Sequence, residues 1–547
     1  MTILIYEARR IHTMNPAQPT ATHVAIRDGR ILGAGSLDSL TGWGTHTLDR
    51  QFADRVLMPG FVEGHSHLIE GAIWRHVYVG YHDRTGPDGV RWPGAKSMDD
   101  VIARLRDAQA CAGDPGTVLV GWGFDPIHLG ERRCTRHDLD QISTERPVAL
   151  LHASLHTVNA NTATLRAASL LRAGLDHPGI PVDDEGLPAG ELKGPDPIAI
   201  LSTRLGLLHP VTTGVDAHAL RSFARLCVRA GVTTATDLAS PLSADEVETM
   251  RAVTGASDFP TRIVALLRNI GQPVPELIER ARALRAESTE MLRLGAIKMV
   301  ADGSIQGFSA RIRWPGYFNG APNGLWYTAP EQARALLAQA LEAGLLVHTH
   351  TNGDEATEMV LDAMQAALAR HYDPDHRFTL QHCQLADAAQ FRRMHALGMC
   401  VNLFANHIYY WGDAHAAQTV GPERAQRMNA CATAIATGVP FAVHSDAPIT
   451  PLGPLFTAWC AVNRITSTGR LLGADERIPV DAALRAITLG AAYTLKLDGE
   501  IGSIECGKRA DFAVLEDDPY ELDPQRLHEA RVWGVVSGGR PFGVRDL

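Results

Sequence analysis

Histidine, lysine and aspartate side chains occur at the ends of short apolar runs along this 547-residue chain. His65 and His67 are one residue apart and directly follow an apolar run with two glycines. Residues i and i+2 of a strand point the same way, so both imidazoles could bind one metal ion. Because the chain has 24 histidines, about one such pair is expected by chance, and a pair of buried core histidines is the alternative.

Four further residues with metal-binding side chains follow the same pattern. Lys298 lies within an apolar run, where a lysine is costly unless it is paired or chemically altered. His350, His382 and Asp446 each end a later run. Each of these three has a simpler interpretation as a packed or capping residue. Their joint placement at one end of several strands favours a shared metal site.

The runs themselves predict parallel strands that alternate with helices, an α/β arrangement. They cover residues 56–62, 233–237, 262–267, 295–300, 345–350, 378–382, 399–404 and 441–446. Several begin after a helix that ends in Ala-Gly, Leu-Gly or Thr-Gly, a common helix terminus. Eight such units predict a (β/α)8 TIM-type barrel with its chemistry at the carboxyl ends of the strands. Five of the eight runs then supply the residues named above.

The two ends of the chain resemble each other. Hairpin signals occur around Asp28-Gly29 and around Gly538-Gly539. Since neither end alone would bury much core, we expect residues 1–56 and 497–547 to pair into one small β-sandwich. The barrel would then span residues 57–496.

A long gap separates the first predicted barrel strand from the second. Residues 70–215 contain strand-like runs of their own at 117–122 and 148–152. We interpret this segment as a large insertion over the barrel mouth, a candidate lid and specificity element.

Composition excludes several classes of protein. With 51 basic and 61 acidic residues the net charge is −10, which argues against nucleic-acid binding. No apolar run reaches 18 residues, so we expect no membrane span, and the first residues lack a signal-peptide pattern. Eight cysteines contain no C-x-x-C, which argues against a disulfide framework or a zinc ribbon. We therefore expect a cytoplasmic protein that acts on a small molecule, with a homodimer as the default oligomer.

Taken together, these motifs resemble those of the amidohydrolase superfamily, in the family 3 branch that includes N-substituted formamide deformylases. The matching segments are 59–67 (PGFVEGHSH), 298–304 (KMVADGS), 350–354 (HTNGD), 381–384 (QHCQ), 444–448 (HSDAP) and 502–512 (GSIECGKRADF). The chain departs from the family pattern at Gln381, where glutamate is usual, and at residues 305–308. We expect both departures to lie in the pocket wall rather than among the metal ligands.

This resemblance implies a two-metal hydrolytic centre. The ligands would be His65, His67 and Asp446 for one ion, His350 and His382 for the second, and Lys298 as a bridging carbamate. Zn²⁺ suits this set of nitrogen and oxygen ligands, although Mn²⁺ or Fe²⁺ would also fit. Hydroxide generated at the metals would attack an amide-type C–N bond, and Asp446 would be the catalytic proton carrier.

Other residues are candidates for substrate binding. His156 in the insertion, His407 after the seventh run, Trp122 and Asp302 are the side chains that we expect to contact substrate. A structural or packing role is the alternative for each of them. His348 and His444 lie two residues before His350 and Asp446, so we expect them to support these ligands from behind.

Three other functions use a similar framework. A single-metal deaminase of a heterocycle would keep most of the ligands but lack Lys298. An ester or lactone hydrolase would use the same site. A metal-free scaffold would show eroded ligands, whereas all six ligands are present here. The sequence therefore favours C–N bond hydrolysis and leaves the substrate open.

Overall fold

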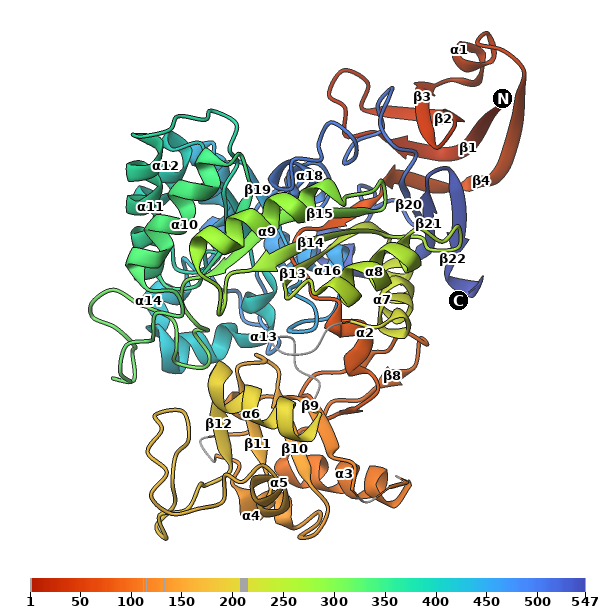
Figure 1. Ribbon diagram of the computed structural model, residues 1–547. Helices are drawn as coiled ribbons and strands as arrows, with labels where there is room; N and C mark the ends of the chain where they lie inside the picture. Colours follow the sequence, from red (N-terminus) through yellow and green to blue (C-terminus); the bar gives the residue numbers. More distant parts are fainter. Residues whose placement is uncertain (1, 112, 115, 131–132, 207–214, 547) are drawn as a thin grey trace.

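The computed structural model describes residues 2–111, 113–114, 116–130, 133–206 and 215–546. Figure 1 shows a central parallel sheet surrounded by helices, with a smaller sheet on one side that contains both chain ends. A third unit, formed by residues between the first two barrel strands, lies against the other side of the central sheet.

The central sheet has eight strands in the order β19-β18-β17-β16-β15-β14-β13-β5. They are β5 (Phe61–Glu63), β13 (Val232–Ser240), β14 (Arg262–Arg268), β15 (Leu292–Val300), β16 (Val347–Thr351), β17 (Thr379–His382), β18 (Cys400–Leu403) and β19 (Phe441–Val443). All the pairings are parallel. A parallel bridge between Ser66 and Ala447 joins the segments that follow the two outer strands. The predicted α/β fold with eight parallel strands is confirmed, and the curled sheet is consistent with a TIM-type barrel.

Helices surround this sheet (Figure 1), and most of them bury apolar side chains in one continuous hydrophobic core. They are α7 (Ala217–Arg229), α8 (Ala244–Thr254), α9 (Val274–Ala286), α10 (Pro330–Glu342), α11 (Asp354–Leu368), α12 (Ala388–Ala396), α13 (Asn406–Ala414), α14 (Gly421–Ala425), α15 (Cys431–Thr437), α16 (Pro454–Asn463), α17 (Val480–Ala486) and α18 (Leu489–Thr494). Strands buried on both faces explain the nearly unbroken apolar runs in the sequence.

The predicted extent of the first barrel strand, residues 56–62, was wrong. Residues 56–59 belong to β4 (His46–Pro59), which pairs with β20 (Phe512–Leu515) in the terminal sheet. The chain enters the barrel only at β5. Gly60 allows this transition because a Cβ there would lie 2.0 Å from the Thr233 hydroxyl oxygen. One long apolar run therefore serves two sheets.

Both chain ends contribute to one seven-stranded sheet, in the order β22-β21-β20-β4-β1-β2-β3. Its other strands are β1 (Ile3–His12), β2 (Thr20–Arg27), β3 (Arg30–Gly35), β21 (Val532–Ser537) and β22 (Arg540–Gly543), with the short helix α1 (Leu37–Thr41) beside them. Both predicted hairpins are confirmed, since Arg27 pairs with Arg30 and Ser537 with Arg540 across two-residue turns of positive φ. The described residues form a single sheet, so a two-layered sandwich stays a prediction.

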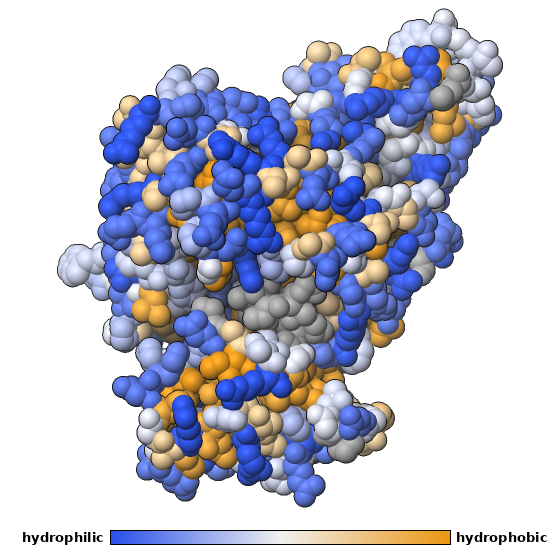
Figure 2. Space-filling view, viewed as in Figure 1, coloured by the Kyte–Doolittle hydropathy of each residue, from blue (hydrophilic) through white to orange (hydrophobic). Residues whose placement is uncertain are grey.

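Residues between β5 and β13 build a five-stranded sheet of their own, in the order β12-β11-β10-β9-β6. The elements are α2 (Ile69–Ile73), β6 (Val77–Tyr78), β7 (Arg84–Thr85), β8 (Arg91–Trp92), α3 (Met98–Cys111), β9 (Leu119–Phe124), α4 (Arg136–Asp140), β10 (Val148–His152), β11 (Thr157–Ala160), α5 (Thr162–Ala167), β12 (Glu191–Lys193) and α6 (Pro195–Leu205). Figure 2 shows hydrophobic residues gathered over α6 on this unit. Its first helix packs tightly on α7, because a Cβ at Gly71 would lie 1.9 Å from the Ala219 carbonyl oxygen.

Within the described part of the chain, none of the helices combines the length and apolarity needed to cross a lipid bilayer.

Candidate metal centre

One cavity at the carboxyl ends of the barrel strands brings together all six predicted ligands. The residues that line it include His65, His67, Lys298, His350, His382 and Asp446. They follow or end β5, β15, β16, β17 and β19, the strands that the sequence pattern indicated. The barrel therefore collects side chains that are almost four hundred positions apart.

Among the described residues, two groups have closely spaced ligand atoms: His65, His67 and Asp446, and His65, His382 and His444. The first group combines two imidazoles with a carboxylate. Asp446 Oδ1 lies 3.3 Å from His65 Nε2 and 3.2 Å from His67 Nε2. The three ligand atoms lie within 4.8 Å of one another. Among the described residues, Asp446 Oδ1 is buried without a hydrogen-bond partner. A buried carboxylate oxygen facing two imidazoles is a suitable ligand set for a divalent cation.

The amine of Lys298 reaches the same group. Its Nζ donates to His65 Nε2 over 3.4 Å, and the residue is only 2% exposed. Burial lowers the pKa of Lys298 to about 7. A substantial fraction of this amine is therefore uncharged near neutral pH.

A series of hydrogen bonds that begins at the Thr494 carbonyl orients the imidazole of His65. His348 Nε2 donates to the Thr494 carbonyl over 2.9 Å, so His348 Nδ1 accepts from the Gln381 amide at 2.7 Å. Gln381 Oε1 then accepts from His65 Nδ1 at 2.7 Å. This order of donors leaves the His65 Nε2 lone pair directed into the cavity.

The expectation that Gln381 belongs to the pocket wall was wrong. It does not line the cavity but lies beneath it, in direct contact with a predicted ligand. Because β17 is parallel to β16, its residue 381 lies across from His350, next to the predicted ligand His382.

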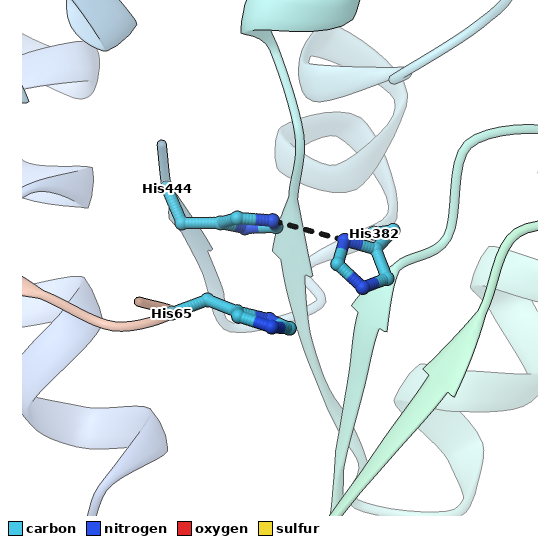
Figure 3. A group of neighbouring side chains, drawn as sticks. All are labelled: His65, His382 and His444. Carbon is cyan, nitrogen blue, oxygen red and sulfur yellow. Dashed lines mark hydrogen bonds between the residues drawn. The ribbon is translucent and has the colours of Figure 1, made fainter. Parts of the chain in front are cut away.

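A second series of hydrogen bonds orients His382, and Figure 3 shows its contact with His444. His444 Nδ1 lies 3.0 Å from the side-chain oxygen Oδ1 of Asn402 and donates to it. His444 Nε2 therefore accepts from His382 Nδ1 at 3.1 Å. His382 Nε2 is left free, whereas His444 uses both nitrogens and stacks on His65 at a centroid distance of 4.7 Å. The prediction that His444 lies behind the ligands agrees with this position.

His350 lies at the edge of the group. Its ring centroid is 4.5 Å from that of His382. Its Nε2 lies 3.3 Å from the Gly303 carbonyl oxygen and 3.1 Å from the Asn352 side-chain nitrogen, which leaves Nδ1 without a hydrogen-bond partner among the described residues. The clusters with closely spaced ligand atoms among the described residues do not include His350, so a second ion stays a prediction.

The imidazoles of the cavity are electrostatically suited to a metal. Burial lowers the pKa values of His65, His350 and His382 well below the usual range for histidine. They are therefore neutral at pH 7, the form that coordinates metal ions. Together with the free carboxylate oxygen of Asp446, these residues fit a divalent cation.

The residues predicted to bind substrate divide into two groups. His156 and His407 line the cavity. His156 approaches His350 with a centroid distance of 6.5 Å, and His407 hydrogen-bonds His415 over 3.0 Å. The insertion therefore contributes to the wall of the site.

Trp122 and Asp302 are not among the residues that line the cavity, so the structure does not support their predicted contact with substrate. Trp122 is 1% exposed and packs between Trp74 and Tyr78 in the core of the insertion. Asp302 is fully buried and accepts backbone N–H groups of Arg311, Asn352 and Gly353. Asp302 therefore organises the loops behind His350.

One supporting residue was missed in the sequence. Glu63 is buried, and its carboxylate accepts from the Ser445 amide and hydroxyl at 3.1 and 2.9 Å. It thereby ties the segment of His65 to that of Asp446. The available signal was a glutamate within an apolar strand, where burial demands hydrogen-bond partners.

Comparison with known proteins agrees with this architecture. A family profile described as "Amidohydrolase family" matches residues 53–542. The chain belongs to the amidohydrolase family. It is 28% identical to the putative amidohydrolase YtcJ of Bacillus subtilis over 556 residues, covering 98% of each chain.

Two other similarities extend this result. The chain is 26% identical to the N-substituted formamide deformylase of Arthrobacter pascens over 552 residues, covering 95% of each chain. An uncharacterized metal-dependent hydrolase from Pyrococcus horikoshii has the same fold, with a TM-score of 0.72, 20% identity and coverage of 96% of this chain and 99% of that one. The resemblance deduced from the motifs is confirmed, and this amidohydrolase family member is placed among hydrolases.

Proposed function

We propose that this chain is a metal-dependent hydrolase that cleaves an amide-type C–N bond, as in an N-acyl, N-formyl or cyclic amide. The arrangement of His65, His67 and Asp446, with an unpaired carboxylate oxygen 3.2 and 3.3 Å from two imidazole nitrogens, carries this proposal. The likeness to a formamide deformylase over nearly the whole chain supports the choice of bond.

The proposed reaction assigns a separate task to each group. His65, His67 and Asp446 would hold one divalent ion, most simply Zn²⁺, and His350 and His382 a second. When bound, these ions would supply a water of low pKa and polarise the substrate carbonyl. Asp446 would take the proton of the attacking water and deliver it to the leaving nitrogen.

Lys298 supports the two-metal form of the site. Its uncharged amine can add CO₂, and the resulting carbamate would be an anionic oxygen ligand between the ions. The lysine also favours amide hydrolysis over single-metal deamination of a heterocycle, which does not need it. Ester or lactone hydrolysis would use the same groups and is the second candidate.

A substrate screen tests this proposal directly. Protein loaded with Zn²⁺ or Mn²⁺ is assayed against N-formyl, N-acyl and cyclic amides, with esters, lactones and amino-heterocycles in parallel. We expect amide hydrolysis, and we expect Asp446→Asn to lower kcat by about 10²–10⁴-fold because the proton carrier is lost. The exposed His371 provides the matched control, since His371→Ala leaves the cavity unchanged.

Three outcomes would overturn the assignment. Activity confined to esters or lactones would show that the enzyme cleaves a C–O bond. Ammonia release from amino-heterocycles would show that it is a deaminase. Full amide hydrolysis by Asp446→Asn would remove Asp446 from its role as proton carrier.

A further inference from the structure

An arginine occupies the strand next to that of Lys298 and lines the cavity. Arg268 ends β14 and lies directly across from Lys298 in the register of β14 with β15. Partners in register on parallel strands send their side chains to the same face of the sheet. Arg268 accordingly lines the same cavity as Lys298 and the histidines.

The guanidinium of Arg268 has no partner in the part of the chain that the structure describes. Among the described residues, no carboxylate lies within 4.0 Å of the guanidinium, no hydrogen bond from it is formed, and its Nη1 is buried without an acceptor. The charges of Glu246 and Arg280 act on Arg268, and Glu246 Oε2 is also buried without a hydrogen-bond partner, but this carboxylate lies beyond ion-pairing distance from Arg268. Burial, the larger effect, lowers the pKa of Arg268 without neutralising so strong a base.

Among the described residues, other buried or half-buried arginines form at least one side-chain hydrogen bond, although single nitrogens of Arg84, Arg293, Arg311 and Arg424 also lack a partner. Arg262 bonds Asp511, Thr234 and the Glu290 carbonyl. Arg464, which is fully buried, donates to backbone carbonyls of Leu472, Asn429 and Met428. Arg268 differs from these arginines because its guanidinium forms no hydrogen bond with the described residues. A half-buried guanidinium without a partner is costly, and a ligand group from outside the chain would supply the missing acceptor.

The wall of the cavity that Arg268 lines also contains apolar side chains. The cavity wall includes Leu155, Ile198, Ile270, Val300 and Phe404. Such a wall suits a hydrocarbon or aromatic body and strengthens an ion pair by excluding water. A guanidinium matches a carboxylate through two parallel N–H···O bonds.

We infer that Arg268 is a specificity residue that binds a carboxylate on the substrate, at the end remote from the scissile bond. This inference rests on the proposed amide hydrolysis and narrows its substrates to amides that carry a carboxylate on an apolar body. The carboxylate would pair with Arg268 while the amide faces His65 and Asp446.

A pair of isosteric substrates tests the inference. The probes are 4-(formamidomethyl)benzoate and N-(4-nitrobenzyl)formamide, which differ in charge but hardly in shape. The metal-loaded protein should prefer the benzoate. Arg268→Met should lower kcat/KM for the benzoate by at least about 30-fold and change that for the nitro compound by less than about 3-fold. Arg268→Lys should restore part of the preference, because it keeps the charge and loses the paired geometry.

Binding measurements keep the test independent of catalysis. By calorimetry, 4-(3-oxobutyl)benzoate, a ketone without a cleavable C–N bond, should bind more weakly to Arg268→Met, and its nitro counterpart should not. The control is Arg334→Met on α10, an exposed position outside the cavity, which should change nothing. The melting temperature and metal content of each variant show that it is folded and loaded.

The outcomes separate the two proposals. Equal rates for both formamides, or equal losses for both in Arg268→Met, would overturn the role of Arg268 and leave amide hydrolysis standing. If neither formamide is cleaved, hydrolysis of these amides fails, and the ketone binding still decides the role of Arg268.

Discussion

The metal ligands could be predicted from the sequence because few residue types bind metal ions. The residues that hydrogen-bond to these ligands could not be predicted. The side chains of Gln381, Asn402 and Glu63 fix the ligands through hydrogen bonds, but amides and carboxylates have many other uses in sequences. Backbone strain was equally invisible. His382 and Asp446 have φ values of 68° and 52°, a region that non-glycine residues rarely adopt and that often marks functional sites.

Gln381 gives a prediction at this scale. Gln381→Leu removes the oxygen that accepts from His65 Nδ1. The proton of His65 is then no longer fixed on Nδ1, and Nε2 is no longer held in its unprotonated, metal-binding form. We expect metal affinity to fall by about 10–100-fold, measured by competition with a chromogenic chelator. Gln381→Glu keeps an acceptor for His65 and should retain most of the affinity. Unchanged affinity in Gln381→Leu would show that the series of hydrogen bonds from Thr494 to His65 does not orient the ligand.

Secondary-structure elements were predictable where they are buried on both faces. Seven of the eight apolar runs correspond to barrel strands with shifts at their ends of a few residues. The exception, residues 56–62, was divided between two sheets at Gly60, and its apolar character does not reveal which sheet it joins. Loops are harder still. Asp302 lies in a matching motif, yet only the structure shows that it organises three loop amides.

Replacement of Asp302 tests this loop function. Asp302→Asn substitutes an amide for one of two oxygens that together accept three backbone N–H groups. We expect unfolding free energy to fall by about 1–3 kcal/mol, measured by denaturant titration. The exposed Asp475 is the control, because Asp475→Asn should have little effect. If the two variants are equally stable, Asp302 does not order these loops.

The whole molecule depends on contacts between parts that are distant in sequence. The insertion closes one side of the cavity through Ser154, Leu155 and His156, a placement that strand patterns cannot supply. A buried ion pair links the barrel to the terminal sheet. Arg262 of β14 lies 2.9 Å from Asp511, just before β20, and their side chains are 2% and 3% exposed.

This ion pair predicts a global effect on stability. Arg262→Met leaves the Asp511 carboxylate buried without its charge partner, and we expect a loss of about 3–5 kcal/mol in urea unfolding. The additional change Asp511→Asn should recover part of this loss, because the unpaired charge disappears. For comparison, the exposed pair of Arg526 and Glu529 should contribute at most about 1 kcal/mol. A loss below 1 kcal/mol in Arg262→Met would mean that the two sheets do not depend on this pair.

The central claim is that the cavity histidines and Asp446 hold catalytic metal, and metal content tests it most directly. After saturation with Zn²⁺ and gel filtration, mass spectrometry of the metal should give about two ions per wild-type chain. We expect His65→Ala and Lys298→Ala to lose bound metal together with activity, and His371→Ala to keep both. Wild-type protein without stoichiometric metal, or full occupancy in His65→Ala, would contradict the account.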